Sequence, residues 1–481
     1  MILKGFVGPS YVSQSPLADQ EETYNLIEER IESPGGTSRS ALYQIPGFEQ
    51  LVATNSSNGR AHEFLAGREF AVIGPAFFEI DEDAAVTFLG TVAVDTNPAT
   101  ISWNGDGGGQ LFITSGGNGY LLTLATNTLT QITALNGLAT MGAAIDGYFL
   151  ALDANTGTFY ISDLLDGATW QTGTQFQQRI AAPDPWVSMS VLGAFIWLMG
   201  SQTSEVWFNS GASPFPFEKH PSGLVQWGIA APFSAKVCDT SLCWLGASAN
   251  GQGFFLRTSE FQPEVISTYA VSRAVNGYGT ISDCYADTYN EDGHTYYIPT
   301  FPTAGKTWCF DLQMSSWTKR GSWDPSQTLG DYGIWRARCH TVAFGQHRWL
   351  HGSGVGVYRM DRSLMEDVDG LPIRRERRAP CLMNENKRVF YSSFELDMEI
   401  GLGTSTGQGS DPQVMMQFSN DGGKTWSSER WRSAGKIGRY DTRVMWDRLG
   451  QARRRVFRVV MTDPVPMRIT NAYIRAKQEA A

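Results

Sequence analysis

Residues 146–163, with the sequence DGYFLALDANTGTFYISD, decide the fold class of this chain. A turn signal at Asp146 and Gly147 precedes one run of apolar residues, and Gly157 precedes a second run. Aromatic and branched residues bounded by Asp and Gly are typical of strands joined by tight turns. The stretch therefore predicts a β-hairpin with apolar side chains to bury.

The same order of turn, apolar run, turn and apolar run returns along the chain. Further copies begin at Gly67, Gly109, Gly193, Leu242, Asp292 and His347. Neighbouring copies start about 40–50 residues apart, which is the spacing of four-stranded propeller blades. A ring of blades covers the apolar face that each hairpin alone leaves exposed. We predict an all-β, six- or seven-bladed β-propeller at residues 49–370; a β-sandwich or solenoid with similar hairpins is the alternative.

Both flanks of the repeat have a different pattern. Residues 1–48 are polar and rich in turn signals, so we expect an N-terminal extended arm or strands there. The segment 19–33 has the composition of a short helix but no steady helical period, which leaves its structure open. Residues 371–481 alternate apolar and polar residues, notably at 389–397 and 455–461. We therefore predict an additional C-terminal β-module.

Charge is divided unevenly between these regions. The chain has 481 residues and a net charge of −10, so it should not bind nucleic acid by bulk attraction. Residues 371–481 hold 20 Lys and Arg against 12 Asp and Glu, a net charge of +8, which leaves −18 for the rest. This asymmetry predicts a boundary near residue 370 and two surfaces with different partners.

The six cysteines are scattered without a C-x-x-C pair, which favours reduced, buried thiols over a disulfide scaffold. No signal peptide is visible at the start of the chain. The most apolar run, residues 187–199, is shorter than the ~20 residues that cross a bilayer. We expect a protein without a membrane span that folds in a reducing compartment.

The sharpest local motif is the Asp-box, with Ser419, Asp421, Gly423 and Trp426 in the pattern S-x-D-x-G-x-x-W. It resembles the turn of sialidase-like and related propellers. An Asp carboxylate accepts backbone N–H bonds in such a turn, Gly supplies a positive φ, and Trp folds back over the hairpin. Because Asp-boxes lie away from the catalytic centre of sialidases, we expect a structural role.

Nucleotide-binding motifs are incomplete. The sequence Gly-Lys-Thr occurs at 305–307 and at 423–425, but Thr300 and Phe418 stand where a phosphate-binding loop needs its first Gly. Turns are the better interpretation, and no cofactor is predicted.

No catalytic or metal-binding residues are predicted either. His340, His347 and His351 are close in sequence, yet nothing visible supplies the three or four converging ligands of a zinc site. Acidic groups such as 81–83 and 366–369 stand at predicted turns, where solvated charges are the default. A glycosidase pair could hide among them, since sequence does not give the separation of two carboxylates.

Seven arginines in the C-terminal region form a candidate docking cluster for a partner. They are Arg374, Arg375, Arg377, Arg378, Arg453, Arg454 and Arg455. Either phosphate or an acidic protein surface could bind them. No aromatic residues are interleaved with them as in a base-stacking platform, which favours a protein partner such as a neighbouring propeller.

The chain resembles the packaged-DNA stabilisation protein family, which are tail-hub or nozzle proteins of short-tailed bacteriophages. The resemblance covers nearly the whole chain and is most specific in the last hundred residues. Its residues are 24–29 (YNLIEE), 42–47 (LYQIPG), 394–397 (FELD), 417–423 (QFSNDGG) and 453–458 (RRRVFR). The N-terminal piece lacks the Trp-Tyr-Pro associated with related chains.

The resemblance implies a non-enzymatic structural protein of the virion tail, assembled in the host cytoplasm. It implies a homo-oligomeric ring, a hexamer, docked below the portal and adaptor proteins. Such a ring extends the DNA channel, retains the packaged genome and docks tail fibres or spikes. Double-stranded DNA would pass its lumen without sequence recognition, and the charge division suggests an acidic wall to which phosphates do not adhere.

Two other readings remain open. A virion-associated propeller glycosidase would need several Arg on the propeller axis, whereas 20 of the 38 basic residues lie in the C-terminal region. A monomeric glycan- or protein-binding propeller is the second. Turnover of polysaccharides would identify the enzyme, and light scattering would identify the monomer.

Overall fold

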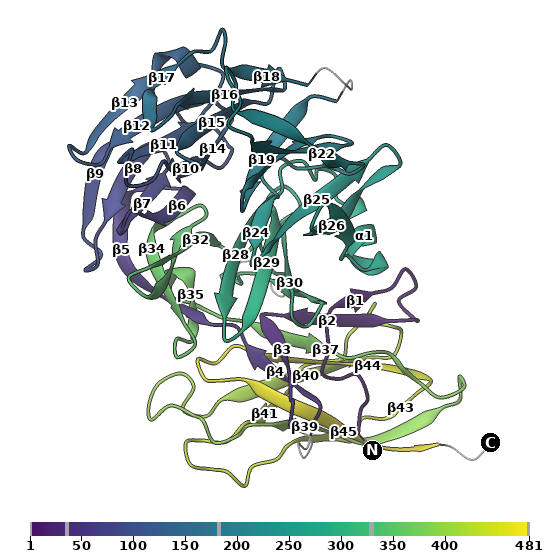
Figure 1. Ribbon diagram of the computed structural model, residues 1–481. Coiled ribbons are helices and arrows are strands. Elements are labelled where there is room, and N and C mark those ends of the chain that lie inside the picture. Colours follow the sequence, from purple (N-terminus) through teal and green to yellow (C-terminus); the bar gives the residue numbers. More distant parts are fainter. Residues whose placement is uncertain (1, 34–37, 180–183, 327–330, 479–481) are drawn as a thin grey trace.

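The computed structural model describes residues 2–33, 38–179, 184–326 and 331–478. Two β-rich modules make up this part of the chain, a ring of sheets and a sandwich below it (Figure 1). The described residues contain a single α-helix, α1 (Tyr269–Asn276). No helix in them is long and apolar enough to cross a bilayer.

Seven blades, each built on four antiparallel strands, form the ring in the described residues, and we number them 1–7 along the chain. Blade 1 contains β6 (Gly59–Leu65), β7 (Arg68–Ile73), β8 (Ala76–Ile80) and β9 (Val86–Thr91). Blade 2 contains β10 (Thr100–Trp103), β11 (Gln110–Ser115), β12 (Asn118–Thr123) and β13 (Thr128–Ile132). Blade 3 contains β14 (Met141–Ile145), β15 (Tyr148–Asp153), β16 (Thr158–Asp163) and β17 (Asp166–Trp170), together with β18 (Phe176–Gln178). Blades 4 and 5 are β19 (Trp186–Leu192), β20 (Phe195–Gly200), β21 (Ser204–Asn209) and β22 (Phe217–Val225); and β23 (Gly228–Ile229), β24 (Lys236–Cys238), β25 (Ser241–Ser248), β26 (Gly251–Ser259) and β27 (Gln262–Val265). Blade 6 is β28 (Tyr285–Glu291), β29 (His294–Phe301), β30 (Lys306–Asp311) and β31 (Ser316–Arg320). Blade 7 is β32 (Ala337–Ala343), β33 (Gln346–His351), β34 (Val355–Asp361) and β5 (Gly47–Ser57).

The hairpin at 146–163 forms as its sequence predicts. Asp146 and Gly147 have φ values of 50° and 82°, the positive values that a tight Asp-Gly hairpin turn requires. Leu150 pairs with Ile161, and both are buried. Phe149, on the opposite face of the same strand, is buried as well. Both faces are apolar because a neighbouring blade packs against each.

The ring closes through its innermost strands and through β5. β6, β10, β14, β19, β24, β28 and β32 surround the centre of the ring (Figure 1). β5 precedes the first blade in sequence but pairs with β34 of the last, with Phe48 opposite Met360. The predicted all-β propeller with an additional C-terminal β-module is confirmed.

The C-terminal module is a sandwich of two sheets. One contains β2 (Gln20–Tyr24), β37 (Arg375–Arg378), β44 (Arg454–Met461), β40 (Gln413–Ser419) and β41 (Arg430–Ser433). The other contains β3 (Leu26–Arg30), β4 (Ser40–Gln44), β45 (Arg468–Gln478), β39 (Val389–Met398) and β42 (Val444–Asp447). Short elements complete the chain: β1 (Tyr11–Val12), β35 (Glu366–Asp367), β36 (Leu371–Pro372), β38 (Leu382–Met383), β43 (Gln451–Ala452) and the 3₁₀ turns Thr133–Leu135 and Val368–Gly370.

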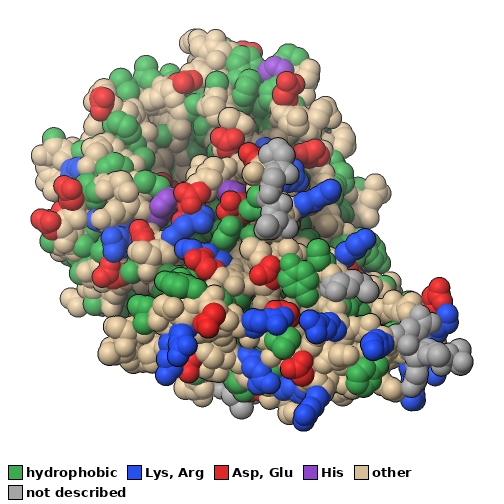
Figure 2. Space-filling model, turned by 90° about the horizontal axis from the view of Figure 1, so that it is seen from below, with side chains coloured by type: hydrophobic (Ala, Val, Ile, Leu, Met, Phe, Trp, Pro, Cys, Tyr) green, Lys and Arg blue, Asp and Glu red, His purple; other side chains and the backbone are tan. Residues whose placement is uncertain are grey.

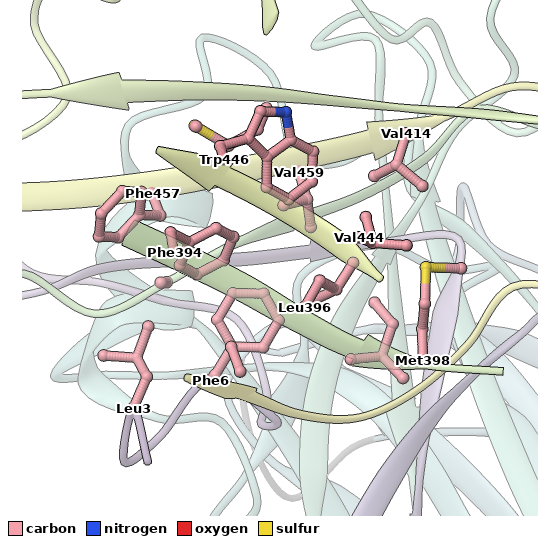
Figure 3. Packing of buried hydrophobic residues seen from close by; sticks show 14 of the residues in the cluster. Leu3, Phe6, Phe394, Leu396, Met398, Val414, Val444, Trp446, Phe457 and Val459 are labelled. Atoms are coloured by element: carbon pink, nitrogen blue, oxygen red, sulfur yellow. The ribbon is translucent and has the colours of Figure 1, made fainter. Parts of the chain in front are cut away.

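Apolar side chains from both sheets fill the sandwich core (Figure 3). Phe394 and Phe457 stack with ring centroids 4.5 Å apart, and Trp446 packs on Phe394. Leu3 and Phe6, from the start of the chain, lie in the same core. The N-terminal segment is therefore part of the sandwich interior.

The N-terminal arm supplies strands to both sheets of the sandwich. The structure of the segment 19–33 was not decided by its sequence pattern. The segment contains β2 and β3, and Asn25 between them has a φ of 54°. β2 joins one sheet, while β3 and β4 join the other. The predicted boundaries at residues 48 and 370 stay proposals.

Candidate functional site: the joint of propeller and sandwich

One continuous sheet connects the propeller to the sandwich. Its strand order is β28-β29-β30-β31-β2-β37-β44-β40-β41, so blade 6 and a sandwich sheet share a hydrogen-bonded ladder. The crossing occurs at β2, where Tyr24 pairs in parallel with Lys319 of β31. On its other side β2 pairs with β37, with Glu22 opposite Arg378. A nine-strand path of this kind resists hinge motion between the modules.

A carboxylate with a side chain only 12% exposed lies at this joint between two cations. Glu22 forms ion pairs with Lys319 of the propeller and with Arg378 of the sandwich. The Arg378 Nη1 atom lies 2.7 Å from Glu22 Oε2. Burial opposes the charge of Glu22, but Lys319 and Arg378 together hold its pKa below the ordinary value. Burial also opposes the charge of Lys319, yet Glu22 raises the pKa of Lys319. Both groups are therefore charged at neutral pH and bind the modules together.

Aromatic stacking and amide bonds reinforce the same joint. Tyr24 and Tyr332 are parallel, with ring centroids 4.1 Å apart. The Asn25 side-chain amide donates to the carbonyls of Gly321 at 2.8 Å and Arg374 at 2.9 Å. One side chain thus bridges the propeller and the sandwich.

Four of the seven predicted docking arginines are buried: Arg374 against Trp323 and Tyr332 at the joint, and Arg375, Arg377 and Arg455 in the sandwich. Arg377 donates to the carbonyls of Phe6 and Pro9 and to Thr23 Oγ1. Burial lowers the pKa of Arg375 and of Arg455 to about 10 in each case. These guanidinium groups bond within the chain and present no surface to a partner.

The other three lie nearer the surface. Arg453 is exposed, Arg454 is half-buried, and Arg378 is half-buried at the joint. A docking role for these three stays a proposal. The sequence pattern did not separate the buried from the exposed arginines, because it does not show that β37 and β44 lie in the middle of a sheet.

The Asp-box forms the turn between β40 and β41. Asp421 Oδ1 accepts the backbone N–H groups of Lys424 and Thr425 at 3.0 Å each, and Ser419 Oγ accepts that of Gly423 at 2.8 Å. Hydrogen bonds from the Ser419 and Thr425 side chains hold the pKa of Asp421 below its usual range. Gly423 has a φ of 88°.

The Asp-box tryptophan, Trp426, lies beside Arg378 of the predicted docking cluster, so the two predicted groups meet here. Arg378 lies 5.2 Å from the centroid of the Trp426 ring, and Arg458 lies 4.6 Å from it. Arg378 and Arg458 also approach Glu376, at 3.7 and 3.8 Å. The motif is thereby linked to the ion pairs of the joint.

Sequence reasoning missed Glu22, Tyr24, Lys319 and Glu376. A signal for them existed in the alternation of charges along β37, where Glu376 and Arg378 share one strand face. Nothing in the sequence indicated that β2 is the neighbour that this face meets.

The centre of the propeller is a cavity of about 350 Å³. Every blade contributes to its wall, as shown by His62, Ser102, Ala143, Ser190, Lys236, Asp287 and Cys339. This is the size of a small-molecule site. A DNA duplex, whose major groove alone is about 12 Å wide, does not pass through it.

Charged groups in this cavity differ in their partners. Arg60 is bonded to Asp95 and Ser115, and the Arg338 guanidinium lies 4.1 Å from the Tyr285 ring centroid. Among the described residues, Lys236 and Glu63 have no ion-pair partner within 4 Å. Burial raises the pKa of Glu63. The two arginines are structural here, because both guanidinium groups are engaged.

The histidines do not form a metal site. His340 and His347 stack, and one ring nitrogen of each lies 2.9 Å from the other. His351 instead bonds Asp369 at 2.8 Å. In the part of the chain that the structure describes, no three His, Cys, Asp or Glu side chains are placed to hold a metal ion.

Two family models match the chain. The one described as bacteriophage P22 Gp10, beta-propeller, matches residues 22–357, and the one described as bacteriophage P22 Gp10, beta-sandwich, matches residues 374–477. The fold defines a protein made of a propeller and a sandwich, and the family models identify it as a phage structural protein. The chain belongs to the bacteriophage P22 Gp10 family of DNA-stabilisation proteins, which confirms the predicted resemblance.

None of the curated proteins matches the chain. Solved structures with a similar fold include the N-terminal domain of Nup159, at 10% identity and a TM-score of 0.41, covering 70% of this chain and 99% of that one. Streptogramin B lyase has 10% identity and a TM-score of 0.42, covering 66% and 98%. Virginiamycin B lyase from Staphylococcus aureus has 10% identity and a TM-score of 0.42, covering 66% and 99%. Folds of this kind serve many functions, so these similarities assign none.

Proposed function

We propose that this structural phage tail protein is a ring-forming hub, or nozzle, of a short-tailed phage. In this proposal, copies of the chain form a homo-oligomer, a hexamer, below the portal and adaptor proteins. The ring extends the DNA channel, retains the packaged genome and docks tail fibres or spikes. The family places the protein in the virion tail; folding in the host cytoplasm is part of the proposal.

The observation that carries the proposal is the continuous sheet through β2. It makes the propeller and the sandwich one stiff body, and a ring that bears internal DNA pressure needs stiff subunits. The central cavity of the propeller does not admit a duplex, so a lumen for DNA has to lie between copies of the chain. This favours an assembly over a monomer.

The charge division supports passage of DNA without adhesion. Residues 1–370 have a net charge of −18. An acidic wall repels phosphates, whereas basic side chains would bind them with release of counterions. If acidic propeller residues face the lumen, charge reversal of those residues slows genome ejection; unchanged ejection would contradict an acidic wall.

Imaging of purified virions tests the proposal. A ring of copies is expected between the head-to-tail connector and the distal end of the tail, and particles assembled without the chain are expected to lose DNA. A single copy beside the channel, or full DNA retention without the chain, would refute the hub function.

A second candidate function is favoured by the cavity alone. Its volume and its unpaired Lys236 and Glu63 suit a small polar ligand such as a sugar unit. The full chain would then bind or cleave a host polysaccharide. Saturable binding that Lys236→Met abolishes would support this candidate, and absence of binding would remove it.

A further inference from the structure

Most of the first three blades of the propeller lacks basic residues. Residues 69–178 contain eleven Asp and Glu and no Lys or Arg. Three of these acids have cationic partners: Glu69 pairs with Arg348, Glu79 with Arg68 and Asp95 with Arg60. Within the described residues, no ion pair joins any of the other eight to a Lys or Arg. This edge of the ring therefore carries uncompensated negative charge.

A small apolar patch lies among these acids. Leu164 and Leu165 are 55% and 40% exposed at the turn between β16 and β17. The Leu165 backbone N–H donates to the Gly147 carbonyl at 2.9 Å, which brings the turn of Asp146 beside it. A Cβ built on Gly107 would lie 3.3 Å from the Leu165 side chain, so the turn of Asp106 is adjacent as well. We name Asp106, Asp146, Leu164, Leu165 and Asp166 the blade patch.

A second patch of opposite charge lies on the sandwich. Residues 430–443 hold five Lys and Arg and one Asp. Within them Tyr440, Ile437 and Trp431 are 72%, 63% and 48% exposed. We name Trp431, Arg432, Lys436, Ile437, Arg439 and Tyr440 the sandwich patch. In the space-filling view from below, many Lys and Arg side chains lie in the lower half of the picture (Figure 2).

The composition of the sandwich patch is that of a protein-binding surface. Trp, Tyr and Arg are enriched among residues that dominate binding energy at interfaces. Among the described residues, Lys436 and Arg439 have no carboxylate within 4 Å, so their charges are free for a partner. Arg432 bonds only backbone carbonyls, those of Met445 and Trp431.

The two patches lie at opposite ends of the molecule, β16 and β17 at the top of Figure 1 and β41 at the bottom. We propose that the sandwich patch of one copy docks on the blade patch of a second copy. Leucines surrounded by aspartates complement aromatics surrounded by Lys and Arg in both polarity and charge. A contact between two different patches is head-to-tail, and it closes into a ring when the rotation per copy permits.

Charge-swap variants of the full chain test this inference, which rests on the proposed ring. Lys436→Glu with Arg439→Glu, and separately Asp106→Lys with Asp146→Lys, should each weaken self-association at least about tenfold in sedimentation measurements at low salt. All four substitutions together should restore much of the loss. Arg475→Glu with Lys477→Glu changes the charge equally on exposed residues outside the sandwich patch and should leave association unchanged. Circular dichroism of each variant verifies folding.

Three outcomes would overturn the inference and remain distinct from failure of the hub function. A wild-type chain that stays monomeric at low salt excludes self-docking, while imaging of the tail still decides the hub function. Association that none of the swaps weakens assigns the contact to other surfaces. Sandwich-patch variants that associate normally but fail to enter tails assign the patch to another tail protein.

Discussion

At the scale of single residues, burial decides what the arginines of the C-terminal module do. A guanidinium moved out of water has to recover its hydration through bonds within the protein. Arg377 recovers it through carbonyls of the first ten residues and through Glu21 at 3.0 Å. Arg455 lies over the rings of Phe418 and Tyr391, at 4.2 and 4.5 Å. Such side chains hold the module together, and an exposed arginine such as Arg453 contributes little to stability.

Arg377→Met should therefore destabilise the protein strongly. Removal of one partner leaves Glu21 and several carbonyls unpaired, and such losses cost about 3–5 kcal/mol. Residues 5–10 should lose protection in hydrogen exchange, because their carbonyls bond this guanidinium. Arg453→Met is the matched control and should change the free energy of unfolding by less than about 0.5 kcal/mol. Equal effects of the two substitutions would contradict this division.

His340 should make the stability of the propeller depend on pH. Burial, and then the neighbouring His347, lowers its pKa from 6.5 to about 3. The rings of Tyr289 and Trp349 also face it. The unfolded chain binds the proton more readily, so the stabilisation is complete above pH 6.5 and is lost as the pH falls toward 3.

The variant His340→Gln isolates this effect. Chemical denaturation of the wild type between about pH 6.5 and 4 should show a component of up to about 1.4 kcal/mol per pH unit that the variant lacks. Carboxylates titrate in both proteins and cancel in the difference. Parallel curves for the two proteins would show that His340 is not the group responsible.

At the scale of elements, strand β5 closes the ring. Without it β34 would present an unpaired edge, and blade 7 would have three strands. The strand enters at Gly47, which is buried against the chain after β34. A Cβ built on Gly47 would lie 2.4 Å from the Leu364 carbonyl oxygen and 2.8 Å from that of Glu366. Only glycine fits there without displacement of backbone.

Gly47→Ala should loosen this closure. Overpacking against backbone costs about 1–3 kcal/mol, and the midpoint of thermal unfolding should fall accordingly. Gly173→Ala is the control, because a Cβ there meets nothing within 4 Å. Calorimetry of both variants checks the prediction. An unchanged midpoint for Gly47→Ala would mean that the backbone after β34 can shift to accommodate the Cβ without loss of stability.

At the scale of the whole molecule, the joint makes two modules behave as one. The shared sheet, the pairs of Glu22 and the stack of Tyr24 on Tyr332 all cross the boundary. Interfaces between domains of one chain are ordinarily small and polar and permit relative motion. A continuous sheet is an exception, and it fixes the distance between the blade patch and the sandwich patch.

We expect the wild-type chain to unfold in one calorimetric transition and Glu22→Ala to split it into two. The substitution leaves Lys319 and Arg378 without their shared carboxylate, a loss of about 3–5 kcal/mol for a buried pair. Glu385→Ala removes an exposed partner of Lys387 and should leave the transition single. Two transitions in the wild type would show that the joint does not couple the modules.

Much of the fold is encoded locally and could be predicted from the sequence. The hairpin at 146–163 depends on a four-residue turn that ends at Gly157, with a φ of 64°, and on strands that pair with their neighbours in sequence. The Asp-box is equally local, since Asp421 bonds residues three and four positions away. The uneven charge is a property of composition alone. These short-range features predict the propeller and the C-terminal β-module, and the resemblance of several sequence segments predicts the family.

Only the tertiary structure decided which distant segments meet. β5 pairs with a strand about 300 residues later, and β2 lies between β31 and β37. The burial of Arg377 and the pairing of Glu22 follow from those neighbours. Strand patterns state which side chains share a face, but the choice of partner strand depends on packing across the whole chain. For this reason the sequence located the arginines, and the structure determined which of them are internal supports.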